Sequence, residues 1–348
     1  MQGKCGLFFT SYEHEDRIFT TGFQKLCMAV FLVLLLVGPL FLNFYLVSIL
    51  TFINIAIVGA VGLNLLTGFC GQISLGHGAF IGVGAYATAV CAQFGIPFVP
   101  ALLIGGSTAA LVGLIFGLPS LRLKGIYLAI STLAAQLILE YVFLHWGSMT
   151  GGANGMAVPA PQMFGFVFDT DLRMFYLTLA VTVVAVIMVT NIVRTRHGRA
   201  FVAIRDFYLS AENVGINLFW LKLQAFAVSS FLAGIAGGLW AYFTLYITPE
   251  QFGIGLSISY LAMIIIGGMG SVLGSIFGAV FITLLPEVLN ISASAAGEFL
   301  PDLSTHLLAL KEGIFGLVLV LFLIFEPEGL VHRWRLIKAY WKLYPFAY

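Results

Sequence analysis

Polar side chains that can bind a solute or pass a proton are scarce in this sequence, and one glycine-rich passage holds several of them. The passage covers residues 62–80 and reads GLNLLTGFCGQISLGHGAF. Its polar members are Asn64, Thr67, Gln72, Ser74 and His77. In an apolar surrounding, amide, hydroxyl and imidazole groups must find partners in protein, water or a bound solute. We therefore take these residues as a candidate translocation path. The alternative for His77 is that it packs and satisfies a backbone carbonyl.

Groups that support catalysis or metal binding do not cluster along the chain. The histidines stand apart, at positions 14, 77, 145, 197, 306 and 332, and the four cysteines show no metal-ligand spacing. No glycine-rich loop ends in Lys-Ser or Lys-Thr, so the usual ATP site is absent from the sequence. Glu140, near the outer end of its expected span, is the only clear acidic candidate at membrane depth. We expect neither an enzyme nor a bound metal or cofactor, and a proton-driven or ion-driven carrier is disfavoured without being eliminated.

The composition places the chain in a membrane. Hydrophobic residues make up 60% of the 348 residues, charged residues only 9%, and the formal net charge is +1. Average soluble proteins contain about 25% charged residues. The net charge is also close to zero, so the composition does not indicate a basic surface that binds nucleic acid. Residues 26–121 contain no Asp, Glu, Lys or Arg, and this length is sufficient for about four spans of ~20 residues.

The apolar segments predict an all-α fold, a polytopic membrane helix bundle of about ten transmembrane helices or half-helices. The expected spans are 26–42, 46–66, 77–94, 99–118, 126–146, 174–193, 223–247, a hairpin over 256–289 broken by GGMGS at 267–271, and 307–325. Short loops rich in Arg and Lys stay in the cytoplasm, which places both termini there. We predict a cytoplasmic tail over 1–25, one transmembrane domain over 26–325 and a basic cytoplasmic tail over 326–348.

The longest polar passage inside this apolar chain covers residues 194–222. Its seven charges, at roughly 3 kcal/mol each, cannot cross a bilayer, and their basic excess predicts a cytoplasmic position. Apolar residues at helical spacing lie beside the charges, Asp206 can cap a second short helix, and Gly215 can end it. We predict an amphipathic segment that projects from the bundle and docks a soluble partner. The alternatives are a solvated connector and a helix lying on the lipid surface.

Small residues at four-residue spacing let helix backbones approach closely. The predicted packing glycines are Gly78, Gly82, Gly234, Gly238, Gly270, Gly274 and Gly278. Two glycine-rich breaks, over 68–78 and 267–278, occupy somewhat similar places in the two halves of the chain. This is a weak sign of an internal repeat.

Four motifs occur in order along the chain: GLNLLTGFCGQISLGHGAFIGVGAYATA at 62–89, TGGANGM at 150–156, GRAFVAIRDFYLSAENVGINLFWLKLQAFAVSSFLAGIAGGLWA at 198–241 and FEPEGL at 325–330. Together they closely resemble the LivM family, the inner-membrane permease subunits of ABC importers for branched-chain amino acids. The resemblance implies that residues 194–222 couple the bundle to a cytoplasmic ATPase. The coupling residues would be Gly198, Arg199, Ala203, Ile204, Arg205, Asp206, Ala211, Glu212 and Gly215. More distant importers have the signature Glu-Ala-Ala, followed by any three residues and Gly, in this segment. This chain matches the signature at Ala211 and Gly215, but it has Leu209 and Ser210 at the first two positions.

The same resemblance implies an assembly at the bacterial inner membrane. Its members would be this permease, a second LivH-like permease subunit, two cytoplasmic ABC ATPases that use ATP, and a periplasmic protein that binds leucine, isoleucine or valine. The lipid bilayer is the remaining partner. One alternative is the same type of permease with urea, amides or other amino acids as cargo. A stand-alone channel or secondary carrier, which needs neither ATP nor partners, is another alternative.

Overall fold

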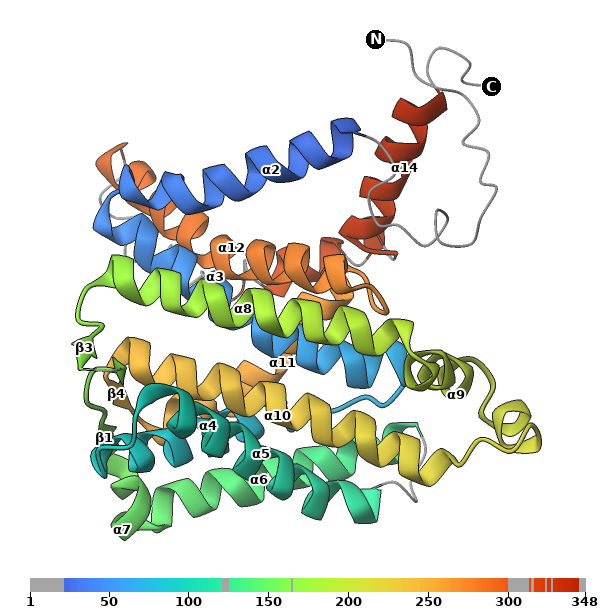
Figure 1. Ribbon diagram of the computed structural model, residues 1–348, viewed down its shortest axis with the longest axis horizontal. Coiled ribbons are helices and arrows are strands. Elements are labelled where there is room, and N and C mark those ends of the chain that lie inside the picture. The colour runs from blue at the N-terminus through green and yellow to red at the C-terminus, as the bar shows by residue number, and fades with distance from the viewer. Residues whose placement is uncertain are drawn as a thin grey trace.

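The computed structural model describes residues 22–120, 125–163, 165–299, 313, 316–322, 324–326 and 328–343. Helices make up most of this structure, so the predicted all-α polytopic bundle is confirmed (Figure 1). In the described ranges, seven helices are long and apolar enough to span a membrane. Most of the predicted tail 1–25 and parts of the predicted span 307–325 and of the predicted tail 326–348 lie outside those ranges. The side on which the termini lie and the count of about ten helices therefore stay predictions.

The long helices follow the apolar runs, because a backbone in hydrocarbon must satisfy its own hydrogen bonds. They are α2 (Gly22–Val37), α3 (Phe44–Asn64), α4 (His77–Gln93), α5 (Phe98–Ser120), α6 (Ile126–His145), α8 (Asp171–Arg194), α9 (Arg196–Asn213), α10 (Leu218–Thr244), α11 (Ile254–Gly267), α12 (Val272–Phe299) and α14 (Leu330–Leu343). Shorter helical turns are η1 (Gly38–Leu40), η2 (Leu65–Phe69), α7 (Gly147–Thr150), η3 (Gly152–Asn154) and η4 (Pro249–Phe252).

In the described part of the chain, four two-residue strands lie in the connections and form two small antiparallel ribbons. Strand β1 (Met156–Ala157) pairs with β4 (Tyr246–Ile247), with Met156 opposite Ile247. Strand β2 (Gln162–Met163) pairs with β3 (Phe166–Val167), with Gln162 opposite Val167. The first ribbon ties the loop after α7 to the end of α10.

Helices α4 and α10 form the centre of the bundle. Helix α10 packs against α3, α4 and α5, and α4 also contacts α11. Where α4 and α10 cross, a Cβ atom on Gly84 would lie 2.2 Å from the Cα atom of Gly234, so the two backbones touch. Helix α4 has only 17 residues, fewer than the ~20 that span a bilayer. A non-helical segment over residues 70–76 takes the place of its first turns.

The predicted packing glycines all lie against another segment of the chain. A Cβ atom would meet Ser257 at Gly78, Phe143 at Gly82, Ala109 at Gly234, Thr88 at Gly238, Arg205 at Gly270, the Gly268 carbonyl at Gly274 and the Met263 carbonyl at Gly278, each at less than 3.0 Å. A side chain at any of these positions requires the neighbour to move. The contribution of each glycine to stability stays a prediction.

The two polar ends of the bundle lie on opposite sides. In Figure 1, α7 and strands β1, β3 and β4 lie at the left-hand end, and α9 lies at the right-hand end. The loop at the left-hand end has a single charged residue, Asp169, between residues 147 and 170, whereas α9 and its flanks are rich in arginine. The basic bias therefore favours a cytoplasmic position for α9 and an external one for the loop.

A reporter fused after Arg205 is expected to behave as cytoplasmic, and one fused near Asn154 as external, because the arginine bias differs between the two loops. An alkaline phosphatase and fluorescent-protein pair at both sites measures this directly. The reverse labelling would contradict the assignment of both ends.

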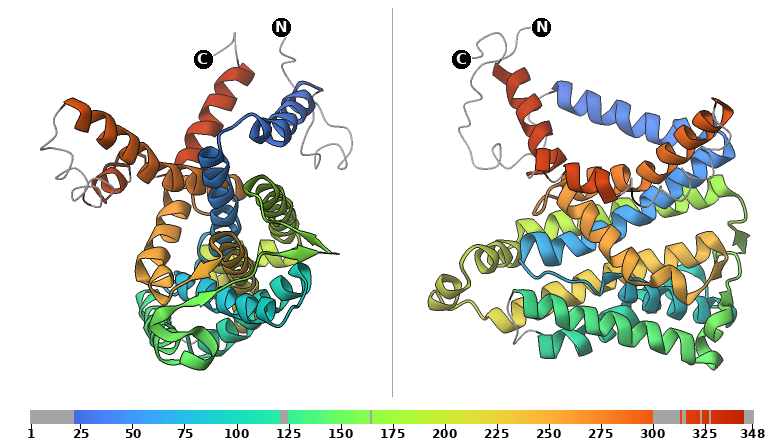
Figure 2. Two further views of the ribbon diagram at one scale, coloured as in Figure 1. Left: turned by 90° about the vertical axis from the view of Figure 1, so that its left-hand side faces the viewer. Right: turned by 180° about the vertical axis from the view of Figure 1, so that it is seen from behind.

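The segment after the last described membrane helix folds back on the bundle. Helix α14 packs against α11 and α12, and it projects on the same side of the bundle as α2 (Figure 2). Gly329 has a φ of +79°, and a Cβ atom there would lie 2.7 Å from the Cα atom of Gly268. Arg333 donates to the Glu326 carboxylate, which lowers the pKa of Glu326 below its ordinary value.

Candidate functional site

The first candidate residues surround a break in the membrane helices between α3 and α4. Helix α3 ends at Asn64, a π-helical turn follows over η2, and residues 70–76 are not helical. Gly71 has a φ of +72°, a conformation that glycine adopts without a steric penalty. Thr67 donates from Oγ1 to the Gln72 carbonyl at 3.0 Å and so holds the turn closed.

Asn64 joins this break to a second one, which separates α11 from α12. Its Nδ2 donates to the Ser271 carbonyl at 2.8 Å and to Ser275 Oγ at 2.7 Å. Its Oδ1 accepts from the Gly270 N–H at 2.9 Å. A Cβ atom on Gly68 would lie only 2.4 Å from the Gly270 nitrogen. The two interrupted helices therefore meet at one point, where a buried amide satisfies backbone groups that the breaks leave open.

Arg205 of α9 reaches the same point. Its Nη1 donates to the Gly68 carbonyl at 2.8 Å, and its side chain also lies against Gly71 and Gly270. Its Nε donates to Asp206 at 2.9 Å, which orients the guanidinium group. The polar segment that we expect to dock a partner is thus in direct contact with both breaks in the membrane helices.

Two members of the candidate path are buried without partners. Among the described residues, neither polar atom of the Gln72 side chain nor the Ser74 hydroxyl has a hydrogen-bond partner. A buried polar group left unpaired costs about 1–3 kcal/mol. Water or a polar solute at these positions would remove that cost. Their role in a translocation path nevertheless stays a prediction.

His77 contacts the helices on both sides of it. Its Nε2 lies 3.0 Å from the Gly59 carbonyl in α3, and its ring packs edge-on against Tyr260 of α11, with 5.4 Å between ring centroids. The imidazole is fully enclosed, with 1% of its surface exposed. These contacts favour a packing role for His77 over direct contact with a solute.

His77→Ala is expected to lower transport by less than tenfold, because one neutral hydrogen bond contributes ~1 kcal/mol and a tenfold change in rate requires ~1.4 kcal/mol. Solute uptake, normalised to the amount of subunit in the membrane, measures the effect. His77→Gln, which retains a donor, serves as the control. Complete loss of uptake at normal membrane levels would instead make His77 part of the path.

Helix α9 consists of two helical pieces with a sharp bend between them. Phe207 has φ −151° and ψ 88°, so the helix is interrupted directly after Asp206. The second piece ends at Gly215, whose φ is +88°. Gly215 N–H donates to the Glu212 carbonyl at 2.9 Å, and Ile216 N–H donates to the Ala211 carbonyl at 3.0 Å. This pair of bonds is the Schellman arrangement that commonly terminates helices at glycine.

The remaining coupling candidates divide between the inner and outer faces of α9. Gly198, Ile204 and Ala211 are buried, Ala203 is half-buried, and Arg199 and Glu212 are exposed. The tip of α9 also presents large apolar side chains to the outside: Phe207 is 75% exposed, Leu209 60% and Val214 82%. Exposed apolar groups beside charges are typical of a surface that contacts another protein or a membrane.

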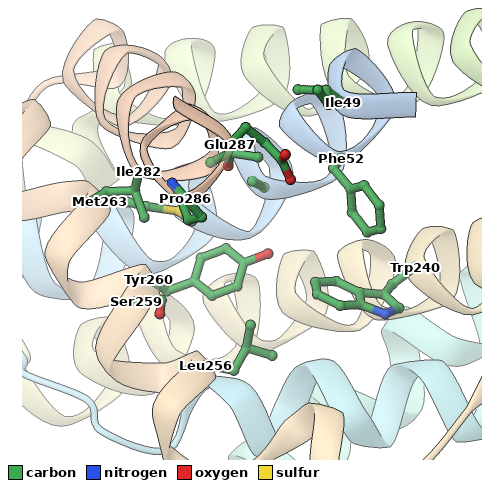
Figure 3. A pocket seen from close by; sticks show the side chains of 12 residues that line it. Ile49, Phe52, Trp240, Leu256, Ser259, Tyr260, Met263, Ile282, Pro286 and Glu287 are labelled. Atoms are coloured by element: carbon green, nitrogen blue, oxygen red, sulfur yellow. The ribbon is translucent and has the colours of Figure 1, made fainter. Parts of the chain in front are cut away.

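A pocket of about 250 Å³ lies apart from the two breaks, among α3, α10, α11 and α12. Figure 3 shows the hydroxyl of Tyr260 and the carboxylate of Glu287 on opposite walls, with Phe52 and Trp240 at one end. The residues predicted as a path do not line this pocket. Of those residues, His77 contacts a residue of the pocket wall, because its ring packs against Tyr260.

Glu287 is the residue that our sequence analysis missed. It lies within the apolar stretch 272–291 of α12, so Glu140 is not the only acidic side chain in a membrane helix. Its position near the end of the expected hairpin 256–289 concealed it. The signal was present, since ionisable residues inside membrane helices are rare and usually functional.

Comparison with known proteins places these features in a family. Residues 45–323 match the family described as "Branched-chain amino acid transport system / permease component". The chain is 30% identical over 337 residues to the "High-affinity branched-chain amino acid transport system permease protein LivM" of Escherichia coli K12, which covers 90% of this chain and 76% of that protein.

More distant relatives include another LivM protein and a permease with a different described cargo. The "Probable branched-chain amino acid transport permease protein LivM" of Methanocaldococcus jannaschii is 24% identical over 243 residues, 66% of this chain and 67% of that one. The "Autoinducer 2 import system permease protein LsrC" of Enterobacter sp. strain 638 is 27% identical over 269 residues, 75% of this chain and 76% of that one. No solved structure matches the chain.

Proposed function

This chain belongs to the family of branched-chain amino acid transport permease components, and we propose that it is the membrane subunit of an ATP-driven importer for leucine, isoleucine and valine. The likeness to LivM over 90% of the chain carries the proposal. The protein is a multi-pass protein of the bacterial inner membrane. It is a transport component rather than an enzyme, and a separate subunit would bind and hydrolyse ATP.

The proposed partners follow the family. They are a second LivH-like permease subunit, two cytoplasmic ABC ATPases and a periplasmic protein that delivers the amino acid. The exposed apolar tip of α9, with Phe207, Leu209 and Val214 beside the charged Arg205 and Asp206, fits a groove on an ATPase. A partner that covers this tip removes its apolar surface from water, which stabilises the complex.

Arg205 links the docked segment to the breaks in the membrane helices. A rigid-body shift of α9 would pull on the Gly68 carbonyl through a charge-assisted hydrogen bond and press on Gly270. Broken helices bend more easily than continuous ones, so both breaks can hinge while the long helices stay intact. We propose that nucleotide-driven movement of the ATPases opens and closes the bundle in this way.

The same machine with another cargo is the nearest alternative, because an autoinducer-2 permease is among the relatives. Uptake of labelled leucine by cells that lack this subunit, with and without the subunit restored, tests the proposal. Leucine uptake should return, and excess isoleucine or valine should compete while urea should not. Restored uptake of urea or an amide without leucine would favour the alternative cargo.

A further inference from the structure

The pocket among α3, α10, α11 and α12 is mostly apolar and of amino-acid size. Its walls include Ile49, Phe52, Leu256, Met263 and Ile282, and its volume is about 250 Å³. Sites for drug-sized ligands have volumes of about 300–1,000 Å³. This pocket therefore suits a smaller molecule with an aliphatic part.

Two polar groups face this apolar space from opposite walls. The Tyr260 hydroxyl has no hydrogen-bond partner among the described residues, although only 1% of Tyr260 is exposed. Figure 3 shows it directed into the pocket, on the opposite side from the Glu287 carboxylate. Tyr45 donates to Oε2 of Glu287, and because each carboxylate oxygen can accept two bonds, Glu287 keeps capacity for a cationic donor.

The Tyr260 hydroxyl is held in place from behind. A Cβ atom on Gly59 would lie 2.5 Å from Cε1 of Tyr260, so the ring rests on the backbone of α3 where that backbone has no side chain. His77 also packs against the ring and bonds to the Gly59 carbonyl. An unpaired hydroxyl that is fixed in this way is prepared for a ligand at no further cost in side-chain freedom.

We propose that this pocket binds a zwitterionic amino acid with an aliphatic side chain. The Glu287 carboxylate accepts from the ammonium group, the Tyr260 hydroxyl donates to the ligand carboxylate, and the aliphatic side chain lies against Phe52, Leu256 and Ile282. A lipid acyl chain would fill the apolar part but would leave the Tyr260 hydroxyl unpaired and would give Glu287 no cationic partner. The inference deepens the proposed function by assigning the ligand site within the membrane subunit.

The test compares leucine with 4-methylpentanoate, which has the same side chain and carboxylate but no ammonium group. Binding of each to the assembled transporter in detergent, without the binding protein, is measured by saturation-transfer NMR. The wild type should bind leucine at least about tenfold more tightly than 4-methylpentanoate, and Glu287→Gln should abolish this preference. Glu140→Gln is the matched control, because it removes the same charge from another membrane helix, outside the pocket, and its preference should be unchanged.

Tyr260→Phe supplies an independent arm of the test. It should weaken leucine and 4-methylpentanoate by the same factor, about tenfold, because both ligands have the carboxylate. No leucine binding by the wild type, or an unchanged preference in Glu287→Gln, would overturn the proposal. If Glu287→Gln fails to assemble, an unchanged affinity of Tyr260→Phe for leucine would overturn the proposal. Leucine binding by a wild type that shows no ATP-dependent uptake would instead reject the importer function and leave the site standing.

Discussion

Gly215→Glu is expected to abolish both co-purification of the ATPase and ATP-dependent uptake, while the subunit still inserts into the membrane. A Cβ atom at Gly215 would meet none of the described residues within 4 Å, so the new side chain would project outward, toward the proposed partner. There it would add a steric clash and a desolvated charge, which together cost far more than the ~0.5 kcal/mol typical of exposed positions.

The left-handed backbone of Gly215 requires a control for strain, because φ is +88° there and a left-handed conformation costs most residues about 1–2 kcal/mol. Gly215→Asn serves as that control, since asparagine tolerates this conformation and adds no charge. Val214→Glu adds the charge at a neighbouring position that is 82% exposed, without a positive φ. If Gly215→Glu and Val214→Glu both retain full uptake and partner binding, the tip of α9 is not the docking surface.

Arg205→Ala is expected to separate docking from transport. The ATPase should still co-purify, because the apolar tip of α9 is unchanged. Uptake should fall by roughly tenfold or more, since a hydrogen bond from a charged donor contributes ~1.5–3 kcal/mol and Arg205 provides one to the Gly68 carbonyl. ATP hydrolysis should continue without stimulation by leucine. Hydrolysis and uptake measured on the same vesicles show this uncoupling.

Arg196→Ala provides the matched control for this variant. Arg196 is the first residue of the same helix, is exposed, and is not one of the predicted coupling residues. Its removal changes the charge of the segment equally and should leave uptake within about twofold of the wild type. Equal losses in Arg196→Ala and Arg205→Ala would indicate that general charge, not the contact with Gly68, supports coupling.

Much of this fold could be predicted from local patterns. The apolar runs gave the membrane helices, and the glycines over 267–271 gave the interruption that separates α11 from α12. The bend directly after Asp206 and the helix end at Gly215 also agree with the capping signals in the sequence. These features depend on residues that are close together in the chain, so a single sequence contains the information that predicts them.

The contacts that build the candidate site, in contrast, join residues that are far apart in the sequence. Asn64 bonds to residues more than 200 positions away, and Arg205 reaches Gly68 across 137 positions. No periodicity or turn signal specifies such pairs, because they arise from the packing of helices that are distant in sequence. The pocket with Tyr260 and Glu287 depends on the same long-range packing.

We expect ATP to drive amino-acid import through this subunit, with α9 as the coupling element. The test uses proteoliposomes that contain the permease pair and the ATPases, with the loaded binding protein outside and ATP inside. We expect labelled leucine to accumulate above the external concentration with ATP, and to stop accumulating with a non-hydrolysable analogue or with Gly215→Glu. Leucine entry of equal rate and extent without ATP would contradict the claim and would favour a channel or secondary carrier.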